Sequence, residues 1–262
     1  MRRRVATAIL LTLVALAAAA VAHAEFAQKG TLRISFNGGI SPRALPREKP
    51  APVELHVEGA IGTTDGSQPP PVQKLEIALN RHGHISTVGL PACTSRLLQS
   101  TSTQAALQRC RPALVGHGTF QANVQFPGTA TIPARGPMLA FYGERGGKPA
   151  LLLHLYITSP TQVTFVLPLV ISHRAKGEYG TLLTAKVPRL AGGLGSVTQI
   201  DLKVSRQYTY RGQRRSFISA SCPVPGGFTE TIFTFAKGLF HFEGGVALET
   251  TLTRNCKARP GT

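Results

Sequence analysis

Two short segments of the chain place a histidine two residues before a glutamate. They are His56-Val57-Glu58-Gly59 and His241-Phe242-Glu243-Gly244. On a β-strand, residues i and i+2 lie on the same face, so each segment would hold an imidazole beside a carboxylate. Brought together, the two segments would form a two-histidine, two-carboxylate metal site. The alternative, which we favour, is that each pair belongs to the outward polar face of its strand. No metal and no cofactor is therefore expected.

A basic and aromatic segment near residue 210 is the predicted binding site. It reads RQYTYRGQRRSF over residues 206–217, and its pattern is typical of a hairpin. Guanidinium groups bind phosphate or carboxylate through paired hydrogen bonds, and tyrosine rings offer flat surfaces beside them. The alternative is a solvated hairpin whose tyrosines pack across the strands. The predicted binding residues are Arg206, Tyr208, Tyr210, Arg211, Arg214 and Arg215.

The chain offers little for hydrolytic catalysis. It contains no G-x-S-x-G motif, and its two aspartates are Asp65 and Asp201. Asp65 precedes a glycine in a predicted turn, and Asp201 alternates with apolar residues on a predicted outward strand face. Glu76 would pair with Asp201 for glycoside hydrolysis only if two halves of the chain mirrored each other. The glycine-rich run 192–196 lacks the lysine of a phosphate-binding loop. We predict no catalytic residue.

The first 24 residues have the pattern of a signal peptide. Three arginines (Arg2, Arg3 and Arg4) precede an apolar run over residues 5–22, and Ala22-His23-Ala24 is a typical cleavage site. The mature chain would begin at Glu25. The alternative is an uncleaved N-terminal anchor. We expect no transmembrane segment after residue 24, and a secreted or cell-envelope protein.

The charge balance of the chain is strongly basic. The formal net charge is +17, and the leader carries three arginines and no acid, so the mature chain has +14. Such a charge attracts anionic envelope polymers or lipid headgroups, with an affinity that falls with added salt. The alternative is that the charge reflects composition alone. No motif predicts binding to a specific nucleic acid, and the oligomeric state cannot be derived from the sequence.

Four cysteines in an exported chain predict two disulfides. The cysteines are Cys93, Cys110, Cys222 and Cys256. Three pairings are possible, of which Cys93–Cys110 with Cys222–Cys256 is the local one. A zinc site would need closely spaced cysteine pairs, which the sequence lacks.

The elements that must position these residues are strands. Apolar and polar residues alternate along most of the chain, and glycines and prolines interrupt the pattern at short intervals. This predicts an all-β protein, an antiparallel β-sandwich or barrel-like sheets, with one short helix near 101–109. Two runs, 150–157 and 165–171, are apolar on both faces, which indicates a doubly covered strand or the wall of a cavity.

Residues 25–262 are predicted to form a single β-rich domain that could consist of two similar halves, about 25–145 and 146–262. The segment VQKLEIALNR at 72–81 resembles VTQIDLKVSR at 197–206, and each is followed by a hairpin and a cysteine. Coincidence among alternating strands is the other explanation.

Several segments resemble a family of exported bacterial proteins. They are GTLRISFNGG at 30–39, GTTDGS at 62–67, NRHG at 80–83, GLPAC at 89–93, and YRGQRRSF at 210–217 leading to Cys222-Pro223. The resemblance spans nearly the whole mature chain. It implies an exported, disulfide-bonded protein and transfers no catalytic residue.

The sequence therefore predicts an exported, non-enzymatic β protein that binds anionic cell-envelope polymers through a basic face. The first alternative is a carrier of an apolar or lipid ligand in a β cavity. The second is a secreted hydrolase of a type that the motifs do not identify.

Overall fold

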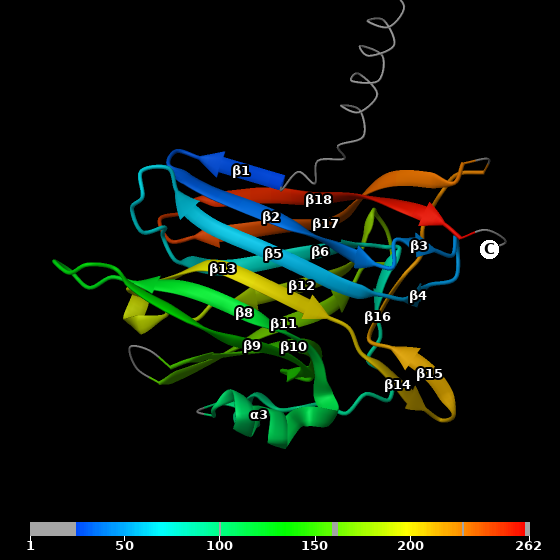
Figure 1. The fold of residues 1–262 in the computed structure, drawn as a ribbon, viewed down its shortest axis with the longest axis horizontal. Helices are drawn as coiled ribbons and strands as arrows, with labels where there is room; N and C mark the ends of the chain where they lie inside the picture. Colours follow the sequence, from blue (N-terminus) through cyan, green and yellow to red (C-terminus); the bar gives the residue numbers. More distant parts are fainter. Residues whose placement is uncertain (1–24, 100, 159–161, 227, 260–262) are drawn as a thin grey trace, which may run out of the picture.

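The computed structural model describes residues 25–99, 101–158, 162–226 and 228–259. The predicted signal peptide, residues 1–24, lies outside the described residues. The all-β prediction is confirmed: strands dominate the chain, and one large sheet curls into a barrel-like body (Figure 1). None of the helices in the described ranges has the length and apolar character needed to cross a membrane.

The large sheet has the strand order β1-β2-β5-β13-β8-β9-β10-β11-β12-β6-β17-β18-β3. All its pairs are antiparallel except β18 with β3. Its strands are β1 (Glu25–Lys29), β2 (Leu32–Ser41), β3 (Ala44–Leu45), β5 (Glu54–Thr63), β6 (Val72–Asn80), β8 (Leu114–Val124), β9 (Ile132–Arg145), β10 (Lys148–Ile157), β11 (Val163–His173), β12 (Tyr179–Lys186), β13 (Gly195–Val204), β17 (Glu230–Phe242) and β18 (Ala247–Ala258).

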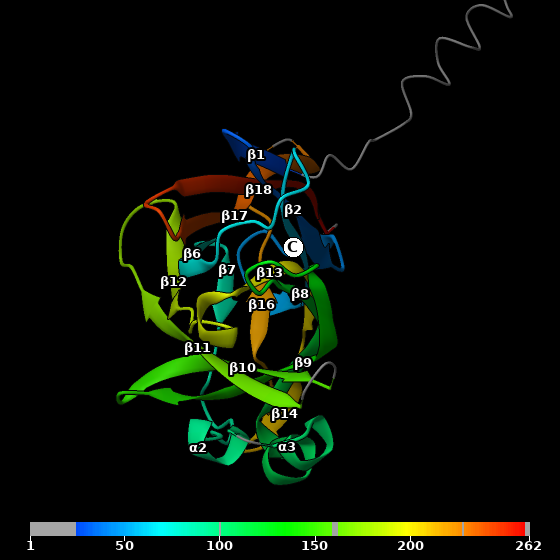
Figure 2. The same ribbon diagram turned by 90° about the vertical axis from the view of Figure 1, so that its left-hand side faces the viewer.

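The two ends of this sheet meet, which gives the barrel its shape (Figures 1 and 2). Arg254 of β18 donates from Nε to the carbonyl of Gly38 at 2.6 Å and from Nη2 to Oδ1 of Asn37 at 2.8 Å, both on β2. Curling also brings strands close at glycines: a Cβ on Gly118 would lie 1.9 Å from the carbonyl oxygen of Asp201. Only glycine therefore fits this approach of β8 to β13.

The alternating pattern decides which side chains face the interior. Along β2, Leu32, Ile34 and Phe36 are buried, and the residues between them face outward. β10 is different because it is covered on both faces. Leu151 and Leu153 belong to the main core inside the barrel, whereas the side chains that alternate with them pack against the helical segment outside.

That outer cover consists of two short helices, α2 (Ser95–Leu98) and α3 (Thr103–Cys110). The prediction of a short helix near 101–109 is confirmed for α3. Ser102 caps it, since its hydroxyl accepts a hydrogen bond from the backbone N–H of Ala105 at 3.2 Å. The disulfide Cys93–Cys110 fixes the segment, and the Cys93 N–H donates to the carbonyl of Tyr142 on β9 at 2.8 Å.

A small sheet closes one end of the barrel. It has the order β4-β16-β7, formed by β4 (Ala51–Pro52), β16 (Ile218–Ala220) and β7 (Gly83–Ile85). The disulfide Cys222–Cys256 joins the segment after β16 to β18 in the barrel wall. Both local cysteine pairs, Cys93–Cys110 and Cys222–Cys256, thus form disulfides in the structure. The two other ways of pairing the four cysteines, which the sequence left open, do not occur.

In the large sheet, each part of the chain contributes one strand that lies among strands of the other part. β6, from the first part, lies between β12 and β17 of the second; β13, from the second part, lies between β5 and β8 of the first. These are the two strands whose sequences resemble each other. Each part of the chain thus inserts one strand between two strands of the other, and the division into two similar halves stays a prediction.

Stability should fall in mild acid because His154 is buried in its neutral form. This side chain on β10 is fully buried, and its Nε2 lies 3.0 Å from the carbonyl oxygen of Thr101, which only accepts. Burial lowers the pKa of His154 from its ordinary value of 6.5, so the unfolded chain binds the proton first as pH falls. The stabilisation is complete above about pH 6.5 and is lost below it, until the folded-state pKa is passed.

Urea unfolding between pH 7.5 and 5 measures this effect. His154→Gln, whose amide keeps a donor for Thr101, should reduce the slope of unfolding free energy against pH by at most about 1.4 kcal/mol per pH unit. His82 and His84 also have lowered pKa values through burial, so part of the slope should remain. An unchanged slope in the variant would contradict the assignment to His154.

Candidate functional site

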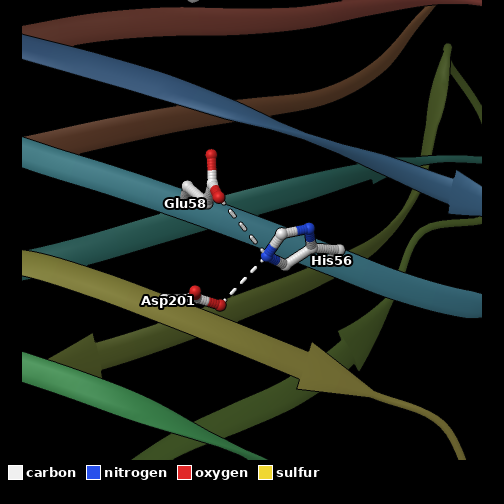
Figure 3. Close-up of side chains that lie close together, drawn as sticks. All are labelled: His56, Glu58 and Asp201. Atoms are coloured by element: carbon white, nitrogen blue, oxygen red, sulfur yellow. Dashed lines mark hydrogen bonds and ion pairs between the residues drawn. The ribbon is translucent and has the colours of Figure 1, made fainter.

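The first His-x-Glu segment lies on the outer wall of the barrel and gains a partner from another strand. His56 and Glu58 are on β5, and Glu58 is the register partner of Asp201 on β13. The Nε2 atom of His56 lies 2.9 Å from Oδ1 of Asp201 and 3.6 Å from Oε1 of Glu58 (Figure 3). Asn37 donates from Nδ2 to Oε2 of Glu58 at 3.0 Å. Asp201 faces outward, as predicted.

These three side chains offer one histidine nitrogen and two carboxylate oxygens within 4.8 Å of one another, a donor set that divalent cations accept. All three are about one-third to one-half exposed. In the structure, the imidazole of His56 contacts both carboxylates, so the three polar side chains are partners of one another across β5 and β13.

The two His-x-Glu segments are not brought together into one site, which was the alternative that the sequence analysis did not favour. Nε2 of His241, on β17, lies 3.7 Å from Oε1 of Glu76, and Oε1 of Glu243 lies 3.9 Å from Nη2 of Arg189. The pair of Glu76 and Asp201 considered for glycoside hydrolysis is not formed either. Glu76 contacts Lys74 at 2.5 Å, whereas Asp201 contacts His56.

The predicted basic hairpin is present as β14 (Gln207–Tyr210) and β15 (Gln213–Ser216). Its turn residues Arg211 and Gly212 both have positive φ, 50° and 75°, as a tight two-residue hairpin turn requires. The tyrosines attach the hairpin to the body. Tyr208 donates its hydroxyl to the carbonyl of Val88 at 2.8 Å, and a Cβ on Gly89 would lie 2.2 Å from the ring of Tyr210.

The predicted binding arginines do not gather on one face. The guanidinium carbons of Arg211 and Arg215 lie 5.3 and 6.0 Å from the ring centre of Tyr210, which is cation–π distance. Arg214 contacts Gln207 at 3.2 Å on the opposite face of the hairpin. Arg211 and Arg214 are exposed, whereas Arg206 and Arg215 are half-buried. Two arginines at the tip are thus open to an anionic partner.

An apolar cavity inside the barrel is the feature that sequence reasoning did not locate. It has a volume of about 120 Å³ and is lined by twenty residues, of which Ser35 and Gln199 alone have polar side chains. Val57, Leu167 and Ile200 face the core from three strands and yet are only half-buried, because the cavity leaves their side chains uncovered. The signal in the sequence was the run 165–171, apolar on both faces.

The cavity lies away from the small closing sheet. β5 begins beside that sheet, where the N–H of Val53 donates to the carbonyl of Ile218 at 3.3 Å. The same strand reaches the cavity at its other end, through Ala60 and Ile61. The barrel is therefore filled by side chains near the closing sheet and hollow toward the opposite end.

Comparisons of the chain with protein-family models, with curated proteins and with solved structures found no match. The resemblance to a family of exported bacterial proteins stays a prediction, and the function has to follow from the geometry of the molecule.

Proposed function

We propose that this protein binds an apolar ligand in the cavity inside the barrel. The observation that carries the proposal is the composition of the lining, in which Ser35 and Gln199 are the two residues with polar side chains. Ser35 alternates with the inward-facing Ile34 and Phe36. The side chain of Gln199 is exposed and accepts a hydrogen bond from Gln121, so the cavity itself is apolar. Ligand sites of this kind combine an apolar wall with very few polar groups, and barrels of many strands enclose them.

The energetics of an empty cavity support the proposal. At about 24 cal/mol per Å³, leaving the 120 Å³ unfilled costs about 3 kcal/mol. Water does not recover this cost, because an apolar cavity gives it no hydrogen-bond partners. An apolar ligand does, since it restores the missing contacts and buries its own surface.

The size of the cavity limits the apolar group that it accepts. An engineered apolar cavity of about 150 Å³ in another protein stays dry and binds benzene. A cavity of 120 Å³ therefore matches a benzene-sized group or a short stretch of an alkyl chain.

Benzene is the probe that tests the proposal. With the chain over residues 25–262, we expect benzene to raise the melting temperature and to shift the NMR signals of the methyl groups of Val57, Leu167 and Ile200. At ten times its dissociation constant, a ligand that binds only the folded state adds about 1.4 kcal/mol to the unfolding free energy. No methyl shift at saturating benzene would overturn the proposal.

The place of action that we propose is extracytoplasmic. The two disulfides are consistent with it, because such bonds persist in oxidising compartments. Binding of anionic envelope polymers, supported by the exposed Arg211 and Arg214, remains a prediction, and a hydrolase of unidentified type remains the second alternative.

A further inference from the structure

The wall of the barrel splits between β11 and β12. Their ladder in the described chain covers only residues 170–173 of β11, ending where Val170 pairs with Thr184. Residues 163–169 of β11 continue to pair with β10 alone, and β12 stays paired with β6 as far as Lys186 and Lys74. The N–H of Val187 then donates to the carbonyl of Gln73 at 2.9 Å, which keeps the chain beside β6. In Figure 2, β12 accordingly lies between β11 and β6.

A groove of about 530 Å³ occupies this split on the outer face. Val166, Pro168 and Val170, the outward residues of β11, form an apolar stretch of its lining. Val187 lines both the groove and the internal cavity. The groove and the cavity therefore lie next to each other, with Val187 between them.

The charged side chains of the groove are cationic, beside the neutral polar residues Ser95, Gln99 and Thr184. Lys74, Arg145 and Lys186 line it, and none of the described residues in its lining is acidic. Lys74 is neutralised by Glu76, whose Oε1 is 2.5 Å from its Nζ. Arg145 and Lys186 are exposed and form no ion pair within the described ranges. The groove therefore carries about two uncompensated positive charges.

The strand register is a second observation that favours an anionic ligand in the groove. Lys186 and Lys74 are direct register partners on neighbouring strands. Like charges directly opposite each other destabilise a strand pair. Glu76 relieves part of this repulsion from one side, and an anion in the groove would relieve the rest.

We propose that the groove holds the phosphate head of a single-chain amphiphile whose alkyl chain passes Val187 into the cavity. The inference rests on the proposed function, because it assigns the chain of the ligand to that cavity. A phosphate monoester carries a charge of about −1.5 to −2 at pH 7, which matches two uncompensated cations better than the single charge of a carboxylate. The guanidinium of Arg145 can bind two phosphate oxygens at once.

The volumes agree with such a ligand. The cavity alone, at about 120 Å³, accepts only part of an alkyl chain, and the groove adds about 530 Å³ beside it. Together they fall within the range of about 300–1,000 Å³ that small-molecule sites occupy.

Four probes with the same twelve-carbon chain test the inference: dodecyl phosphate, dodecanoate, 1-dodecanol and dodecyltrimethylammonium. Each is titrated by calorimetry below its micelle concentration, at low salt and pH 8. We expect dodecyl phosphate to bind about tenfold or more tightly than dodecanol, equivalent to about 1.4 kcal/mol. Dodecanoate should lie between them, and the cationic probe should bind most weakly.

Charge reversal in the groove provides the matched test. Arg145→Glu combined with Lys186→Glu should weaken dodecyl phosphate binding about tenfold or more and leave dodecanol binding within about threefold. Lys29→Glu with Arg135→Glu changes the net charge equally at exposed positions outside the groove. This control should leave dodecyl phosphate binding within about threefold.

The outcomes separate the inference from the proposed function. Equal binding of dodecyl phosphate and dodecanol, or equal losses in both variants, would overturn the groove as the head site while the cavity still binds the chain. Tighter binding of dodecanoate than of dodecyl phosphate would overturn the phosphate head. Failure of all four probes, together with failure of benzene, would overturn the cavity itself.

Discussion

Replacing Ile200 with tryptophan is expected to abolish benzene binding while the barrel stays folded. Ile200 faces the cavity from β13, and its register partner on β5 is Gly59, which has no side chain to fill the space. A Cβ on Gly59 would lie 3.1 Å from Cγ1 of Ile200, so side chains at position 200 already lie over this glycine. An indole ring there would cover Gly59 and occupy the volume that we assign to the ligand.

The stability of Ile200→Trp results from two opposing effects. Filling the cavity removes part of the cost of about 3 kcal/mol, whereas a poor fit of the larger side chain costs about 1–3 kcal/mol. We therefore expect the melting temperature to stay within about 4 °C of the wild type. The benzene-induced rise in melting temperature and the methyl shifts of Val57 and Leu167 should both disappear.

Two further variants make the result specific. Thr119→Trp places the same side chain on the exposed outer face of the neighbouring β8, and benzene should bind this variant as it binds the wild type. Ile200→Ala enlarges the cavity, so it should cost about 2–5 kcal/mol of unfolding free energy and keep benzene binding. Undiminished benzene binding by a folded Ile200→Trp would place the binding site elsewhere.

The alternation of apolar and polar residues was sufficient to predict the strands and the all-β class. It did not distinguish a sandwich from a barrel, because both bury one face of each strand. The difference depends on contacts such as those of Arg254 with Gly38 and Asn37, which join residues more than 200 positions apart. Close approaches such as that of Gly118 to β13 have no sequence signal beyond the glycine itself.

The two runs that are apolar on both faces, 150–157 and 165–171, show what the sequence pattern cannot predict. Both β10 and β11 contribute leucines to the barrel interior. The outer face of β10 is covered by the segment that the Cys93–Cys110 disulfide holds, whereas the outer face of β11 forms part of the groove. Apolar composition is the same in both cases, and only the tertiary arrangement decides between a covered strand and a cavity wall.

The polar candidates show a related limit. The spacing of His56 and Glu58 correctly placed them on one face, but their third partner, Asp201, is 145 residues from His56 and is brought there by the pairing of β5 with β13. The hairpin at Arg211 was predictable from its turn chemistry. The use of Tyr208 and Tyr210 to attach it was not, because that depends on the distant residues Val88 and Gly89.

Removing the Cys222–Cys256 disulfide is expected to cost more stability than any surface change. Its loop spans 34 residues, and the loss of loop-closure entropy on breaking it corresponds to about 4 kcal/mol, out of a total that is about 5–15 kcal/mol for most domains. Cys222→Ala with Cys256→Ala should therefore lower the melting temperature by about 8–16 °C. Substituting both residues avoids leaving a free thiol in a fully buried position.

The other disulfide is the matched control for this prediction. The loop between Cys93 and Cys110 spans 17 residues, so the same entropy argument gives about 3 kcal/mol for Cys93→Ala with Cys110→Ala. The two bridges also hold different parts: Cys222–Cys256 ties the closing sheet to the wall, whereas Cys93–Cys110 ties the outer helices.

Hydrogen exchange should accordingly speed up in the variant that lacks Cys222–Cys256, at the N–H groups of Ser221 and Cys222. These N–H groups donate to the carbonyl oxygens of His82 and Pro46. In the second variant these amides should keep their wild-type protection. If the first variant melted within about 2 °C of the wild type, the closing sheet would be held by its packing alone and the assigned role of the bridge would be wrong.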